Sequence, residues 1–376
     1  MKKVEKYKYV SLAPMMKACP NAQYYIMIGQ RSNGKTFSVI ERFLDNWWNS
    51  KETMSNAVIR RWEEDFNKSK GVKTFENLVF NAERGNIVAS KTNNKYNAIV
   101  FYLRAWWCVF INERGEEERR SPVPIAYAFA ISLEPHYKSA SYPRIKDILF
   151  DEMISRTYLV DEFISFMNLL STIIRLRDDI KIFMCGNTLS GYCPYIAEMG
   201  LKNIRQMKLG DIVVYKMGKD ERMKIVVYMT DSITKKGKPS DIYFCFDNPA
   251  LKMLTGENVW ELALYPHCPT KYKPMNIKLI YFISFDGEVF QCEIIEKDKE
   301  WFTFIHRKTT PIKNDKDIIF QQEFDYRDNV RRKITKPSDK LGKFIASFYT
   351  EDKVFYQDNE IGDMVHQYLS WCAQAR

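Results

Sequence analysis

The chain has 376 residues, of which 45% are hydrophobic and 14% aromatic, and this composition excludes a disordered or low-complexity protein. Its net charge of +10 suits a polyanionic partner without identifying one. Eight cysteines form no C-x-x-C pair and four histidines have no metal-ligand spacing, so the sequence predicts neither a zinc ribbon nor a redox dithiol. The lysine-rich start is not followed by an apolar stretch long enough for a signal peptide, and no run of about 18 apolar residues occurs. We therefore expect a soluble, intracellular, globular protein.

The first motif with a chemical meaning is a glycine loop at residues 29–36. It reads Gly29-Gln30-Arg31-Ser32-Asn33-Gly34-Lys35-Thr36 and matches the phosphate-loop pattern G-x-x-x-x-G-K-[ST]. A short apolar run at 24–28 precedes it as a strand would, and a helical apolar pattern at 37–48 follows it. In this context the loop N–H groups would cradle phosphate oxygens, Lys35 would reach the β- and γ-phosphates, and the Thr36 hydroxyl would bind Mg²⁺. The loop therefore predicts a site for ATP and Mg²⁺.

A second part of the same site is predicted at residues 145–152. The apolar run that ends at Phe150 is followed by Asp151 and Glu152, which is the pattern of a Walker B strand. Asp151 would hold Mg²⁺ through water, and Glu152 would orient and polarise the attacking water. Adjacent carboxylates are common on protein surfaces, but their agreement with the upstream loop favours the functional interpretation.

Two more elements follow in the order that an additional-strand ATPase requires. Residues 160–177 carry a helical apolar stripe that ends in Arg175-Leu176-Arg177, and residues 180–187 form an apolar run that ends in Asn187. In ring ATPases of this type the polar residue at that strand end senses the γ-phosphate. From spacing alone, the two arginines are best explained as basic residues that interact with the C-terminal end of the helix dipole.

The remaining segments predict the domain organisation. Residues 57–62 indicate a strand that runs into a basic pair, and 99–111 with 123–131 indicate an inserted β-hairpin in which Trp106-Trp107 serve packing. Residues 211–216 and 223–229 predict two further strands. We expect an α/β ATPase domain at 1–230, a linker and small connector at 231–270, and a separate domain at 271–376.

The last domain is expected to be an RNase H-like α+β fold. A hairpin at 277–285 and 288–295, a third strand at 301–307, and helices at 341–349 and 359–372 support this. Its candidate nuclease carboxylates are Asp286, Glu293 and Asp363, which do not converge if the hairpin is regular, so we expect no nuclease activity. Seven basic residues against two acidic ones at 327–343 fit a phosphate-contacting loop, and a solvated loop fits equally well.

In this order the motifs resemble those of the φ29-like DNA packaging ATPases, the encapsidation proteins of small short-tailed phages. The resemblance runs nearly end to end. It is carried by the glycine loop, the strand end 58–62, Tyr142-Pro143 before 148–152, the segment 168–175, Asn187 with Cys193-Pro194-Tyr195, and the tail 341–348. The turn at 112–120 and the linker are longer than in the best-known member.

The resemblance implies an ATPase that drives double-stranded DNA into an empty capsid. It implies a homo-oligomeric ring, a pentamer, that acts in the host cytoplasm on the portal vertex; some members also need a structural RNA there, and this sequence leaves that need open. Arg175 occupies the place of an arginine finger that acts on the neighbouring subunit's ATP, with Arg177 as the alternative. The resemblance also implies that the C-terminal domain has lost nuclease catalysis and contacts nucleic acid.

Three other readings compete with packaging. A replication-type DNA helicase or translocase could carry the same nucleotide motifs, because fold similarity does not fix the task. A GTP-binding switch would use Thr335-Lys336-Pro337-Ser338-Asp339, which resembles a guanine-recognition motif but follows a basic loop rather than a buried strand. A non-catalytic nucleic-acid scaffold would have no use for the complete hydrolysis set.

Overall fold

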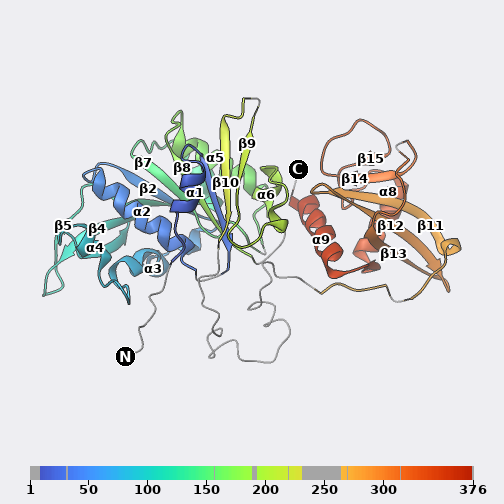
Figure 1. The fold of residues 1–376 in the computed structure, drawn as a ribbon, viewed down its shortest axis with the longest axis horizontal. Coiled ribbons are helices and arrows are strands. Elements are labelled where there is room, and N and C mark those ends of the chain that lie inside the picture. The colour runs from blue at the N-terminus through green and yellow to red at the C-terminus, as the bar shows by residue number, and fades with distance from the viewer. Residues whose placement is uncertain are drawn as a thin grey trace. The chain divides into compact units, whose positions relative to one another are not determined.

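The chain folds as two compact units, Met1–Leu189 with Gln206–Phe246 and Ser190–Arg205 with Asp247–Arg376. The computed structural model describes residues 9–30, 33–155, 157–188, 193–218, 220–230, 264–268, 270–313 and 315–374 (Figure 1). The predicted linker at 231–240 and most of the predicted connector lie outside these residues. Across the described ranges, no helix combines the length and apolar composition that crossing a bilayer requires.

The first unit is built on a ten-stranded sheet with the order β3-β4-β6-β2-β7-β8-β1-β10-β9, in which β5 pairs with β4. Strand β1 is parallel to β8 and β10, and β7 is parallel to β8 and β2. One strand, β8, therefore separates β1 from β7. The strands are β1 (Tyr24–Gly29), β2 (Ser55–Arg60), β3 (Ala98–Tyr102), β4 (Ala105–Ile111), β5 (Glu117–Arg120), β6 (Ala126–Ala130), β7 (Ile145–Phe150), β8 (Lys181–Asn187), β9 (Ile212–Met217) and β10 (Met223–Met229).

Helices cover both faces of this sheet, which is why its central strands are apolar without alternation. All six residues of β1 are buried. Side chains from α2, α3 and α4 form one core with Tyr25, Val58 and Leu149 of the strands. On the other face, the Phe150 ring of β7 lies 4.8 Å from the Phe166 ring of α5. The helices of this unit are α1 (Ala13–Ala18), α2 (Lys35–Asn49), α3 (Lys68–Val79), α4 (Ile87–Lys91) and α5 (Glu162–Ile174).

The predicted hairpin at 99–131 is wrong in its pairing. The run predicted as one strand is two antiparallel strands, β3 and β4, joined at Leu103 and Arg104, which both have positive φ angles (48° and 55°). The second predicted strand, β6, pairs in parallel with β2 along its whole length and with β4 at two positions only. Trp106 is fully buried against Phe66, Phe75 and Phe101, which confirms the predicted packing role for this residue, whereas Trp107 is only partly buried.

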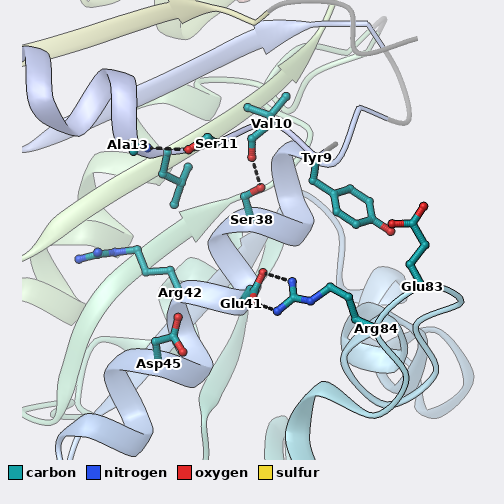
Figure 2. A pocket seen from close by; sticks show the side chains of 11 residues that line it. Tyr9, Val10, Ser11, Ala13, Ser38, Glu41, Arg42, Asp45, Glu83 and Arg84 are labelled. Carbon is teal, nitrogen blue, oxygen red and sulfur yellow. Dashed lines mark hydrogen bonds and ion pairs between the residues drawn. The ribbon is translucent and has the colours of Figure 1, made fainter. Parts of the chain in front are cut away.

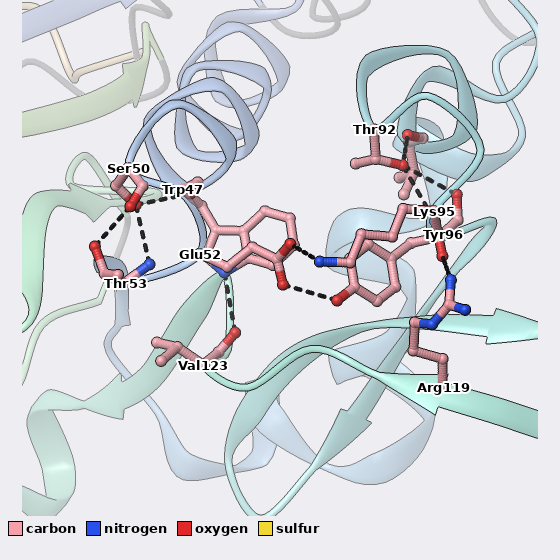
Figure 3. A network of polar contacts seen from close by, with 10 residues as sticks. Trp47, Ser50, Glu52, Thr53, Thr92, Lys95, Tyr96, Arg119 and Val123 are labelled. Atoms are coloured by element: carbon pink, nitrogen blue, oxygen red, sulfur yellow. Dashed lines mark hydrogen bonds and ion pairs between the residues drawn. The ribbon is translucent and has the colours of Figure 1, made fainter.

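A network of hydrogen bonds and an ion pair connects the residues after α2 to the segment before β3 (Figure 3). The Glu52 carboxylate is 6% exposed, accepts a hydrogen bond of 2.7 Å from the Tyr96 hydroxyl, and pairs with Lys95. The Trp47 indole N–H donates to the Val123 carbonyl at 3.0 Å. Burial and the neighbouring Glu52 raise the pKa of Tyr96, so the hydroxyl stays a donor.

We expect Tyr96→Phe to destabilise the first unit by about 1–3 kcal/mol, because a buried carboxylate oxygen loses its donor. The matched control is Tyr102→Phe, because Tyr102 is 54% exposed. Removal of this exposed hydroxyl should change the free energy of unfolding by less than about 0.5 kcal/mol. Urea denaturation of the full chain measures both. Equal stabilities for the two variants would contradict a structural role for this network.

The second unit is built on a six-stranded sheet with the order β15-β14-β11-β12-β13-β16. Strands β11, β12 and β13 form the predicted antiparallel meander, while β14 and β16 pair in parallel with β11 and β13. The two predicted helices are present as α8 and α9, and the three short strands were not predicted. The elements are α6 (Pro194–Glu198), β11 (Ile277–Phe285), β12 (Glu288–Lys297), β13 (Glu300–Arg307), β14 (Ile318–Gln321), β15 (Val330–Arg331), α8 (Lys340–Thr350), β16 (Val354–Tyr356) and α9 (Asn359–Gln374).

The candidate nuclease carboxylates of this unit lie on different elements. Asp286 is in the β11–β12 turn with a φ of 52°, the Glu293 carboxylate on β12 accepts from Tyr272 at 2.8 Å, and the Asp363 carboxylate on α9 accepts from Gln367 at 2.9 Å. In the described part of the chain, no three His, Cys, Asp or Glu side chains gather closely enough to hold a metal ion between them.

The basic stretch at 327–343 is partly neutralised by its own neighbours. The Arg327 guanidinium donates to Asp325 at 2.6 Å, and Arg331 donates to Asp339 at 2.5 Å. The other oxygen of Asp339 accepts from the Gly342 N–H at 2.5 Å and so caps α8. Asp339 is therefore occupied as a helix cap, which disfavours its use in guanine recognition.

Candidate active site

The carboxyl ends of β1, β7 and β8 meet at one edge of the first sheet, next to the start of α2. A cavity of about 370 Å³ lies there. Its lining brings together the predicted site residues Asn33, Gly34, Lys35, Thr36, Asp151, Glu152 and Asn187 with Tyr9, Phe37, Asn77 and Cys185. Ligands of open α/β sheets bind at such an edge.

The loop from β1 to α2 contains two positions, Gly29 and Gly34, at which a larger residue would clash. Gly34 has a φ of 84°, which side chains disfavour, and a Cβ there would lie 2.4 Å from the Tyr9 ring. A Cβ on Gly29 would lie 2.0 Å from the Thr230 hydroxyl oxygen. Close packing therefore requires glycine at both positions, and at Gly34 the backbone conformation requires it as well. Arg31 and Ser32, two of the predicted phosphate contacts, lie outside the described residues.

Lys35 is buried at the centre of the site, with 5% of the residue exposed. Its ammonium donates to the carbonyl oxygens of Gln30 at 2.7 Å and Gly29 at 3.2 Å, and to the amide oxygens of Asn187 at 3.0 Å and Asn33 at 3.1 Å. Burial lowers its pKa to about 8. Four acceptor oxygens therefore surround the Lys35 ammonium, and its hydrogen bonds connect the glycine loop to the end of β8.

The Thr36 hydroxyl donates to one oxygen of Asp151 at 2.7 Å, so the two predicted Mg²⁺ ligands lie side by side. A hydroxyl and a carboxylate are oxygen ligands of the kind that Mg²⁺ takes beside phosphates, so these residues fit the metal. The other Asp151 oxygen accepts from Arg60 at 2.9 Å. Arg60 was not predicted to belong to the site, although its place in a basic pair at the end of a buried strand could have indicated it.

Glu152 has an exposed side chain that lines the cavity, and its φ of 61° lies in the left-handed region. This conformation is uncommon for a residue with a side chain and is concentrated at functional positions. The neighbouring residues fix it: the Asp151 N–H donates to Ile59 of β2 at 3.1 Å, and the Met153 N–H donates to Cys185 of β8 at 2.8 Å.

The two arginines after α5 have different environments. Arg175 is exposed, with a φ of 57°, and its guanidinium donates to the Ala140 carbonyl of its own chain at 2.9 Å. Arg177 donates to carbonyl oxygens of Ile173, Ile174, Tyr142, Pro143 and Ile145, and burial lowers its pKa. Arg177 therefore caps the helix, as the spacing argument favoured, and cannot serve as a finger without breaking these bonds.

A second cavity, of about 440 Å³, lies beside the first between the segment 9–13 and α2 (Figure 2). Tyr9 lines both cavities. The Glu41 carboxylate accepts two hydrogen bonds from Arg84, at 2.6 and 2.9 Å, and the Ser38 hydroxyl donates to the Val10 carbonyl. The Ser38 contact joins the N-terminal segment to the start of α2, next to the glycine loop, and the Arg84 contact joins α2 to the turn after α3.

Comparisons with known proteins can be set beside this geometry. The family model described as podovirus DNA encapsidation protein (Gp16) matches residues 124–210, which include Asp151, Glu152, Arg175 and Asn187 but not the glycine loop. No curated protein matches the chain. Among solved structures, the Phi-28 gp11 DNA packaging motor matches with a TM-score of 0.55 and 17% identity over 99% of both chains. The Phi-29 viral genome packaging motor assembly matches with a TM-score of 0.53 and 15% identity over 96% of this chain and 98% of that one. The chain is thus similar over 124–210 to the podovirus encapsidation family and, in its fold, to these two packaging motor proteins.

Proposed function

We propose that the chain is the ATPase of a phage DNA packaging motor, which hydrolyses ATP to move double-stranded DNA into an empty capsid. The observation that carries the proposal is the meeting of Lys35, Thr36, Asp151, Glu152 and Asn187 around one cavity, from three strand ends and a glycine loop. The likeness to the encapsidation family and to the Phi-28 and Phi-29 motors supports the packaging task.

The topology of both units supports the fold that this proposal assigns. Strand β8 lies between β1 and β7, which supports its assignment as the additional strand of an additional-strand P-loop ATPase. In the second unit, the order β13-β12-β11-β14-β15, with β14 parallel to β11, supports an RNase H-like domain that contacts nucleic acid. The proposed partners are DNA, the portal of the capsid, and further copies of this chain in a ring, with five as the proposed number.

The site residues have distinct roles in this proposal. Bound Mg²⁺-ATP supplies the phosphoryl group whose transfer to water drives movement. When phosphate binds, Lys35 would donate to phosphate oxygens in place of the Gly29 and Gln30 carbonyls. Because Lys35 also donates to Asn187, phosphate binding in the loop would be coupled to the end of β8. Thr36 would hold the metal directly and Asp151 through water, while Glu152 would orient the attacking water and accept its proton. Arg60 balances the charge of Asp151.

The alternative reading as a replication-type DNA translocase shares all of these residues and differs only in its partner. Stimulation of ATP hydrolysis separates the two. We expect empty capsids that carry portals, together with double-stranded DNA, to raise the hydrolysis rate of the full chain well above the rate with DNA alone. Stimulation by forked DNA and not by capsids would overturn the packaging proposal, and stronger competition by GTP than by ATP would overturn the ATPase assignment.

A further inference from the structure

The arginine that follows Arg60 holds the backbone beside the proposed catalytic carboxylate. Arg61 is 5% exposed and forms an ion pair of 2.7 Å with Glu162, which is 1% exposed, in the first turn of α5. The same guanidinium donates to the carbonyl of Glu152 at 3.3 and 3.4 Å and to the carbonyl of Met153 at 3.4 Å. Arg61 thus connects α5 to the residue whose side chain lines the cavity.

Further described residues between 152 and 159 also lie close to this guanidinium or to its partner Glu162. The Tyr158 ring lies 4.9 Å from it, and the Tyr158 hydroxyl accepts from the Ser155 N–H at 2.9 Å. The Leu159 N–H donates to Glu162 at 2.7 Å, on the same oxygen that pairs with Arg61. One buried ion pair therefore fixes both ends of the segment.

The conformation of Glu152 explains why such a device would be needed. Its left-handed φ of 61° is unfavourable for a residue with a side chain and persists only where surrounding contacts impose it. Strands β2 and β8 fix the amides before and after it, at Asp151 and Met153, but the Glu152 carbonyl has Arg61 as its donor. Arg61 is not among the residues that line the cavity, and its contact with the Glu152 carbonyl connects it to a residue that does line it.

We propose that Arg61, held by Glu162, is a positioning residue that aims the Glu152 carboxylate at the attacking water. The proposal rests on the ATPase function proposed above. A fixed guanidinium suits this task because its planar donors contact a carboxylate and two carbonyls together, which the compact ammonium of lysine cannot do. The expected consequence is a rate effect without a matching effect on nucleotide affinity, since Lys35 and Thr36 hold the phosphates and metal independently.

The test compares Arg61→Lys with a matched control, Arg42→Lys. Arg42 also forms an ion pair of 2.7 Å, with Asp147, which lies four residues before Asp151 and so roughly 13 Å away along the strand. We expect Arg61→Lys to lower kcat about 10- to 100-fold, because misplacement by about 1 Å costs up to about 100-fold, and to leave ATP affinity within about twofold. Arg42→Lys should leave kcat unchanged. Amide hydrogen exchange without nucleotide should become faster over 152–159 in Arg61→Lys only.

A double-mutant cycle separates positioning from a general structural role. In a Glu152→Gln background, Arg61→Lys should lower the residual rate by less than about twofold, because the group it positions is already gone. An equal rate loss in both backgrounds, or unchanged exchange over 152–159, would overturn the proposal. If Arg61→Lys does not fold, Glu162→Gln, which keeps the side-chain shape, should give the same pattern. A normal rate in Glu152→Gln alone would instead refute the proposed function, while the exchange experiment would still show whether Arg61 holds the segment.

Discussion

Glu152→Gln should bind ATP with unchanged affinity and hydrolyse it about 10²–10⁴-fold more slowly, whereas Lys35→Ala should lose ATP binding itself. The difference follows from what each side chain touches. Glu152 lines the cavity with an exposed carboxylate and acts on the attacking water, so its effect falls on the transition state. Lys35 is the buried charge on which the loop converges and contacts phosphate in the ground state as well.

Lys35→Ala removes more than a phosphate contact. Asn187 and Asn33 lose the donor that they share, so the end of β8 is no longer joined to the loop. Each hydrogen bond to a charged group contributes about 1.5–3 kcal/mol, and we therefore expect affinity to fall by at least about tenfold.

Isothermal titration calorimetry and single-turnover hydrolysis measure the binding and the rate separately. Glu113→Gln, in the exposed turn before β5, is the control for removing a carboxylate and should leave both quantities unchanged. If Glu152→Gln turned over at the wild-type rate, the assignment of Asp151 and Glu152 as the hydrolysis pair would be wrong.

The elements that the sequence predicted well are those with a strong local signal. The central strands are buried on both faces and so read as continuous apolar runs, and the glycine loop requires a backbone that few other residues adopt. These features placed β1, α2, β7 and β8, and with them Lys35, Thr36, Asp151, Glu152 and Asn187, at one edge of the sheet. Because each of these side chains lies at or just after the end of an apolar run typical of a parallel strand, their convergence was predictable before the strand order was known.

The features that were missed depend on contacts between distant segments. The turn at Leu103 and Arg104 has no glycine, proline or asparagine, so nothing local marks the break between β3 and β4. Strands β14, β15 and β16 have four, two and three residues. Their parallel pairing, of β14 with β11, β15 with β14 and β16 with β13, has no signal within the strands themselves. Arg60 and Arg61 were interpreted as one basic pair, but Arg60 at the end of β2 pairs with Asp151, whereas Arg61 just after the strand pairs with Glu162.

Arg175→Ala should lower ATP hydrolysis by the assembled ring about 10³-fold or more while ATP binding persists, because we propose that Arg175 acts on the ATP of the neighbouring subunit. Arg175 lies too far from the ATP site of its own chain to act there. Arg175 precedes the start of β8, whereas Asn187 ends that strand, and seven strand residues span roughly 20 Å. To contact a phosphate, the Arg175 guanidinium would give up one hydrogen bond, to the Ala140 carbonyl.

The surface around Arg175 is consistent with a subunit contact. Ile164, Asn168 and Ser171 form one exposed stripe on α5 that leads to Arg175, and Ile164 is 57% exposed. Leu176, next to Arg175, is fully exposed, and so large an apolar side chain gains from burial against a partner. Arg114→Ala, in an exposed turn, is the control for the loss of a surface arginine and should leave hydrolysis unchanged.

Mixed rings give the decisive result. Arg175→Ala subunits keep Glu152, and Glu152→Gln subunits keep Arg175, so a mixture contains junctions at which an intact Glu152 meets an intact Arg175 from the neighbour. We expect each variant alone to be nearly inactive and the mixture to recover part of the hydrolysis rate, in proportion to the number of such junctions. Subunits that carry both substitutions should restore nothing when mixed with either single variant, because no new intact junction forms. Absence of recovery in rings shown to contain both single variants would mean that Arg175 does not act across the subunit boundary and that its hydrogen bond to Ala140 is its role.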